Sequence, residues 1–145
     1  MAVTDEQVAA MRAILMGNVD EHTRLAQQFD DNNGWEAYST LLAAAFYEAV
    51  DRRFGKSHTL ADVIQFVADA RTRFDESGQD VDSRAAERLV LAVLGEGSVD
   101  DLDDSTVART QMVLLADLVA QANLDDNGLD EFLSYSRKLA DRTMS

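Results

Sequence analysis

The sequence predicts an all-α fold: a compact bundle or orthogonal array of about six helices in a single domain, residues 1–145. Apolar residues recur at spacings of three and four along most of the chain, and alternating strand-like patterns are absent. The chain contains no proline, so no helix is interrupted from within. Its 145 residues, 46% of them hydrophobic, suit one domain with its own core.

The first predicted helix begins at Thr4. Thr4 and Gln7 have the spacing of a capping box, in which each side chain bonds the backbone N–H of the other residue. Two interpretations remain open at Gly17. Either the helix continues, with Asn18 and His22 on its apolar stripe, or Gly17 ends it and a second helix begins just after Asn18.

Short polar turns separate the remaining predicted helices. The run 30–34 predicts a turn, in which Gly34 can take a positive φ, before a helix over residues 35–54 that Gly55 ends. The run 125–128 predicts another turn. Further helices are predicted over residues 59–76, 82–94, 105–123 and 129–142. The first of these four is expected to bury Leu60, Val63, Ile64, Val67, Ala70 and Phe74.

The chain is strongly acidic, with a formal net charge of −14. Duplex nucleic acid and anionic membrane surfaces repel such a protein, so we expect no direct nucleic-acid binding. No apolar run approaches the roughly 20 residues of a membrane span, and no signal peptide is visible, so we expect a cytoplasmic protein. The charge favours a basic partner, or it serves solubility alone.

Motifs for catalysis are absent from the sequence. Without cysteine there is no disulfide, cysteine nucleophile or cysteine-bound zinc. Nucleotide-binding loops, hydrolase nucleophile elbows and zinc-protease motifs are missing too. We therefore predict no catalytic residue, no metal and no cofactor, and favour a protein that is not an enzyme. The remaining enzyme hypothesis is a metal held by carboxylates and His22, although no Glu-x-x-His motif precedes that histidine.

Two acidic segments are the predicted partner-binding sites. They comprise Asp100, Asp101, Asp103 and Asp104 in the first, and Asp125 and Asp126 in the second. We expect reversal of Asp101 and Asp103 to lysine to slow binding and leave stability nearly unchanged. The second segment also resembles the first half of a calcium loop, but Ser134 stands where a bidentate glutamate is required, which favours a plain helix–turn–helix.

Aromatic residues gather on the helix predicted over residues 35–54. Most are expected in the core. Trp35 and Tyr47 are candidate partner-binding residues if they are exposed, because aromatic side chains are enriched at protein interfaces.

A basic cluster stands against the acidic background and suggests a second function. It comprises Arg52, Arg53, Lys56 and His58. A phosphate or carboxylate could bind these side chains beside the N-terminus of the next helix. The alternative is that the arginines complement a helix dipole and pair with local acids. The leading hypothesis is a non-enzymatic interaction protein (an inhibitor, immunity-type protein, adaptor or regulator) that binds a basic protein, and a small-molecule or anion-binding domain is the alternative.

Overall fold

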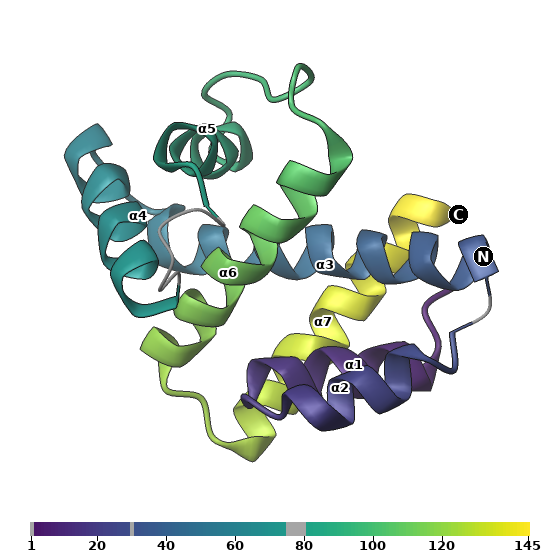
Figure 1. Ribbon diagram of the computed structural model, residues 1–145. Helices are drawn as coiled ribbons and strands as arrows, with labels where there is room; N and C mark the ends of the chain where they lie inside the picture. The colour runs from purple at the N-terminus through teal and green to yellow at the C-terminus, as the bar shows by residue number, and fades with distance from the viewer. Residues whose placement is uncertain (1, 30, 75–80) are drawn as a thin grey trace. The chain divides into compact units, whose positions relative to one another are not determined.

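The computed structural model describes residues 2–29, 31–74 and 81–145, and within them the secondary structure is helical throughout (Figure 1). The helices are α1 (Asp5–Leu15), α2 (Val19–Ala26), α3 (Asp31–Phe54), α4 (Leu60–Phe74), α5 (Ser83–Val93), α6 (Asp104–Ala122) and α7 (Asp126–Met144). The predicted all-α fold is confirmed. None of the described helices combines the length and the apolar character that a membrane span requires.

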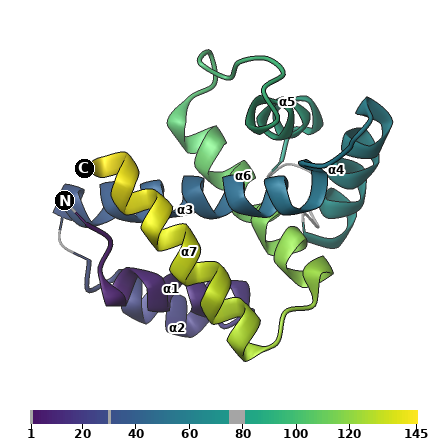
Figure 2. The same cartoon turned by 180° about the vertical axis from the view of Figure 1, so that it is seen from behind.

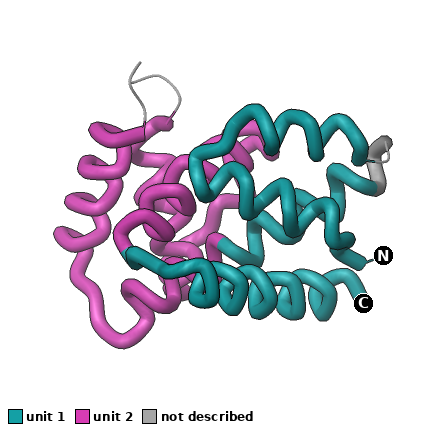
Figure 3. Tube along the Cα trace, turned by 90° about the horizontal axis from the view of Figure 1, so that it is seen from below, with its two compact units in different colours: residues 1–45, 122–145 teal, residues 46–121 magenta. Residues whose placement is uncertain are grey.

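The chain divides into two compact units, which Figure 3 colours separately. Unit 1 comprises residues 1–45 and 122–145, and unit 2 comprises residues 46–121. In unit 1, α1 packs against α2 and α7. In unit 2, α4 packs against α5. The single domain stays a prediction.

The helix starts follow the capping signals in the sequence. The capping box at Thr4 is confirmed, with Gln7 N donating to Thr4 Oγ1 at 3.2 Å and Thr4 N donating to Gln7 Oε1 at 2.8 Å. Thr59 and Asp62 form the same reciprocal pair at the start of α4, at 3.0 and 3.1 Å. Asp82 caps α5 by accepting the backbone N–H of Ala85.

The two interpretations of the first helix are resolved in favour of a break. α1 ends at Leu15, and Gly17 adopts a φ of +81°. The Asn18 side chain then accepts the backbone N–H of Glu21 at 3.1 Å and caps α2. A left-handed residue followed by a capping residue reverses the chain, because neither can continue the preceding helix.

The predicted turn at residues 30–34 is wrong for the part that the structure describes. α3 begins at Asp31, so Gly34 lies in its first turn with helical backbone rather than at a positive φ. A Cβ at Gly34 would lie 3.1 Å from the Cβ of Phe29, so glycine allows these two segments to approach more closely than a larger residue would. Gln7 Nε2 also donates to the carbonyl of Gly34 at 2.8 Å. Position 30 lies outside the described residues.

The predicted turn at residues 125–128 is also wrong. α7 begins at Asp126, and Asp125 is its N-cap, accepting the backbone N–H of Gly128 at 2.6 Å. The preceding helix, α6, ends at Ala122, and the next residue, Asn123, has a φ of +51°. Asparagine tolerates this left-handed conformation better than most residues, so Asn123 can end α6, and residues 123–125 connect the two helices.

The buried face of α4 differs from the prediction at three positions. Leu60, Ile64 and Phe74 are 58%, 43% and 41% exposed. The buried residues are Val63, Phe66, Val67 and Ala70. This face is narrower than the apolar stripe because Leu60 and Ile64 flank it rather than lie on it. The predicted end of this helix beyond residue 74 lies outside the described residues.

Candidate functional site

The candidate site is the acidic connection of unit 2, which we define as residues 94–104, from the end of α5 to the first residue of α6. Gly95 and Gly97 begin it with φ angles of +82° and +104°, as expected for glycines that end a helix. Leu102 N then donates to Val99 O at 3.0 Å and closes a turn. Four aspartates follow each other closely around this turn, and α6 begins at the last of them.

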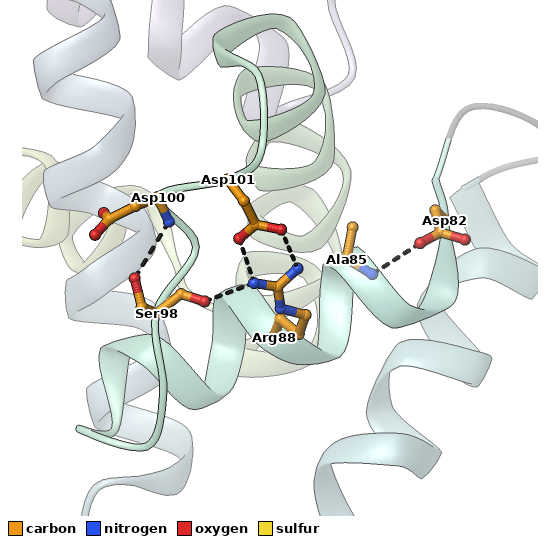
Figure 4. Close-up of polar contacts among 6 residues, drawn as sticks. All are labelled: Asp82, Ala85, Arg88, Ser98, Asp100 and Asp101. Atoms are coloured by element: carbon orange, nitrogen blue, oxygen red, sulfur yellow. Dashed lines mark hydrogen bonds and ion pairs between the residues drawn. The ribbon is translucent and has the colours of Figure 1, made fainter.

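Arg88 of α5 fastens the acidic connection (Figure 4). Its Nη1 and Nη2 donate to the two carboxylate oxygens of Asp101 at 3.1 and 2.5 Å. Nη2 also donates to the carbonyl of Ser98 at 2.8 Å. These bonds lower the pKa of Asp101 and raise the pKa of Arg88, because each charge stabilises the other. A bidentate pair fixes orientation as well as distance, so the connection is held in one geometry.

Asp103 has a structural role at the start of α6. Its Oδ1 accepts the backbone N–H of Thr106 at 2.7 Å, and this bond lowers the pKa of Asp103. Because Asp101 holds Arg88 and Asp103 caps a helix, we expect reversal of either to cost stability. The expectation that this double reversal leaves stability nearly unchanged therefore no longer stands.

The carboxylates of Asp100 and Asp104 are available to bind another protein. Both are exposed, and within the described part of the chain neither carboxylate makes a hydrogen bond or ion pair. The backbone N–H of Asp100 donates to Ser98 Oγ at 3.2 Å, and Figure 4 shows its carboxylate turned away from Arg88. The connection thus presents two solvated carboxylates on a fastened backbone.

The acidic segment of unit 1 is engaged within that unit. Asp125 caps α7, and Asp126 lies 3.5 Å from Arg12 Nη2. Arg12 Nη1 lies 3.6 Å from Asp130. These contacts connect α1 to the start of α7. Of the two predicted acidic segments, only the one in unit 2 leaves carboxylates without a structural partner among the described residues.

Trp35 and Tyr47 are both exposed, at 48% and 47%. The Trp35 ring packs edge-on against Phe29, with the ring centroids 5.1 Å apart, and against Tyr38 at 6.0 Å. Trp35 and Tyr47 were candidates only if they were exposed, and both are. Partner binding by either residue stays a prediction. The two residues belong to different units, so each remains a separate candidate.

His22 is a hydrogen-bonded, half-buried residue of unit 1. Its Nε2 lies 2.9 Å from the hydroxyl of Tyr38. Burial lowers the pKa of His22 and raises the pKa of Tyr38, because it disfavours the charged form of each. Among the residues that the structure describes, no group of three His, Asp or Glu side chains is placed to hold a metal ion.

The basic cluster of unit 2 is largely engaged by its own surroundings. Arg52 Nε donates to Glu48 at 2.7 Å, the Arg53 guanidinium lies over the rings of Phe54 and Phe66 at 5.3 and 5.1 Å, and His58 Nε2 lies 2.6 Å from Glu96. The bond to Glu96 raises the pKa of His58. Each of these three cations therefore contacts a different intramolecular partner. An anion site at this cluster stays a prediction.

One ion pair, between a buried carboxylate and a partly exposed arginine, has no counterpart in the sequence analysis. Asp117 of α6 is fully buried and accepts from Arg73 Nε at 2.7 Å and Nη2 at 3.2 Å. Thr110 is buried on the same helix, and its Oγ1 has no hydrogen bond among the described residues. Thr110, Leu114 and Asp117 recur at spacings of four and three, which is the one signal in the sequence that places Asp117 inward.

The chain was compared with protein-family models, curated proteins and solved structures. None of the three comparisons finds a significant match. The case for function therefore comes from the residues and their contacts.

Proposed function

We propose that this chain is a non-enzymatic interaction protein that binds a basic protein partner through the acidic connection of unit 2. One observation carries the proposal: Arg88 fastens the connection with three hydrogen bonds while Asp100 and Asp104 keep solvated carboxylates. A loop that is already ordered loses less conformational entropy when it binds. The carboxylates can then accept from arginine or lysine side chains of the partner.

The charge pattern supports a partner rich in arginine or lysine. Residues 96–104 contain five acidic residues and no basic one. Such a patch accelerates encounter with a basic surface and rejects acidic partners, and it changes affinity less than it changes rate. An inhibitor, an immunity-type protein, an adaptor and a regulator would each use a surface of this kind.

The proposal includes a cytoplasmic setting and excludes direct nucleic-acid binding. A chain without cysteine suits a reducing compartment, because it needs no disulfide for stability. The net charge of −14 opposes contact with phosphate backbones.

Affinity capture from native cell lysate at low and high salt tests the proposal. The bait proteins are the wild type, the double variant Asp100→Lys with Asp104→Lys, and a control variant with Asp20→Lys and Glu131→Lys. The control makes the same change in charge at exposed acids of unit 1. Circular dichroism melts of all three baits establish that they remain folded.

The proposal expects a basic protein, identified by mass spectrometry, that wild type and control retain in stoichiometric amount at low salt. High salt and the Asp100/Asp104 variant should each release it. If nothing is retained at low salt, or if the double variant retains the same protein as the wild type, the acidic connection is not the binding surface.

A further inference from the structure

The second half of α7 carries a basic and aromatic surface in unit 1. Tyr135, Lys138 and Arg142 are spaced by three and four residues, so they share one face of the helix. Together with Asp141 they line a surface cavity of about 540 Å³. This volume is within the range of small-molecule sites, about 300–1,000 Å³, but the cavity is open, so a bound ligand stays partly in solvent. Figure 2 shows α7 crossing in front of α1 of the same unit.

The two cations at this cavity lack the partners that the other cations of unit 1 have. Arg12, Arg24 and Arg137 each lie within 4 Å of a carboxylate. Among the described residues, Lys138 and Arg142 have no such partner. Acidic side chains outnumber basic ones in the chain by 27 to 13, yet these two neighbouring cations stay available to a ligand.

Of the two remaining groups at the cavity, Tyr135 suits a flat apolar part of a ligand, whereas the carboxylate of Asp141 opposes an anion. Asp141 is the one acid in the wall, and its Oδ1 accepts the backbone N–H of Val3 at 2.8 Å. Arg137 binds the carbonyl of Val3 from the same helix at 2.7 Å, so the N-terminal segment is fastened beside the cavity. The side chain of Tyr135 is half exposed and offers an aromatic face.

We infer that this cavity is a binding site for a small organic anion. Lys138 and Arg142 bind the phosphate or carboxylate oxygens, and the ring of Tyr135 contacts a planar apolar group. The guanidinium of Arg142 can bind two oxygens at once, whereas Lys138 acts as a point charge. The site is independent of the acidic connection, because it lies in the other unit and has the opposite charge.

Titration of the ¹⁵N-labelled protein, followed by amide chemical shifts in NMR spectra, tests this inference. The probes are phenyl phosphate, benzoate and inorganic phosphate. The test variants are Lys138→Ala with Arg142→Ala, and Tyr135→Ala. The control is Arg84→Ala with Arg109→Ala, which removes two exposed cations from unit 2.

Phenyl phosphate or benzoate should cause saturable shifts in α7, and whichever binds more tightly identifies the preferred head group. The Lys138/Arg142 variant should weaken this binding about tenfold or more, and the control should not. Tyr135→Ala should weaken phenyl phosphate and leave inorganic phosphate unchanged. Absence of saturable shifts with both aromatic probes, or equal binding by the Lys138/Arg142 variant, would overturn the inference and leave these cations to complement the helix dipole.

Discussion

At the scale of single residues, the fully buried carboxylate of Asp117 depends on its ion pair with Arg73, because a buried charge without a partner is unfavourable. Arg73 supplies two hydrogen bonds to it, at 2.7 and 3.2 Å. Arg73→Met keeps most of the aliphatic volume but leaves a buried carboxylate without its cation, which is strongly unfavourable. We expect this variant to lower the melting temperature by several degrees, measured by circular dichroism.

A matched control is the exposed pair between Arg24 and Glu21. Exposed pairs contribute little to stability, so Arg24→Met should change the melting temperature only slightly. Equal effects of the two substitutions would show that burial of Asp117 does not set the strength of its ion pair.

The bond between His58 and Glu96 predicts a pH dependence of stability in unit 2. Glu96 raises the pKa of His58 above its ordinary value of 6.5, chiefly through a side-chain hydrogen bond. A raised pKa means that the folded state binds the proton more tightly than the unfolded chain does. The stabilisation is therefore complete below pH 6.5 and is lost as pH rises through the folded-state pKa.

Glu96→Gln should remove much of this dependence. We expect the difference in melting temperature between wild type and variant to be largest below pH 6.5 and to shrink at higher pH. Taking the difference at each pH cancels the contribution of His22, whose pKa burial lowers. A difference that stays constant or grows with rising pH would contradict the predicted linkage.

Local sequence patterns do not predict which side chain a given residue contacts when the two are far apart in the chain. The apolar stripe that would include His22 required a continuous first helix, which the break at Gly17 rules out, although His22 is hydrogen-bonded to Tyr38. The burial of Asp117 was not predicted. The apolar face of this helix was assigned from Leu114 and Leu118, and an aspartate between two leucines is normally expected to be exposed. Its partner Arg73 is 44 positions away, and no local pattern connects the two.

At the scale of helices, Gly17 ends α1 with a φ of +81°, and a Cβ there would meet no atom within 4 Å. Gly17→Ala therefore isolates the backbone cost of a left-handed residue from any steric clash. We expect it to lower the free energy of unfolding by about 1 kcal/mol, measured by urea denaturation. An unchanged or increased free energy of unfolding would show that the chain reverses without this conformation.

Capping chemistry made the helix starts at Thr4, Thr59 and Asp82 predictable from sequence. The boundaries that failed involve residues with two possible roles. Gly34 was expected to permit a positive φ, but it provides close approach to Phe29 inside a helix. Asp125 was expected in a turn, but it caps α7. The close approach of Phe29 decides the role of Gly34, and the bond from Gly128 N decides that of Asp125, although the local sequence allows both roles at each position.

At the scale of the whole chain, the charge of −14 is visible in the sequence, but the use of each carboxylate is not. Asp101 and Asp103 looked as suitable for a partner as Asp100 and Asp104. The structure distinguishes the two pairs of aspartates, because Asp101 binds Arg88 of α5 and Asp103 caps α6. The predicted acidic segment was therefore a sound candidate, although half of its acids hold the structure together.

The most direct test of the proposed function is the association rate of this protein with the basic partner that affinity capture identifies. The rate constant for wild type should fall as salt increases, and the Asp100→Lys and Asp104→Lys variant should associate about tenfold more slowly or worse at low salt. Dissociation should change less than association. An association rate that depends neither on salt nor on these two substitutions would contradict a partner steered by the acidic connection.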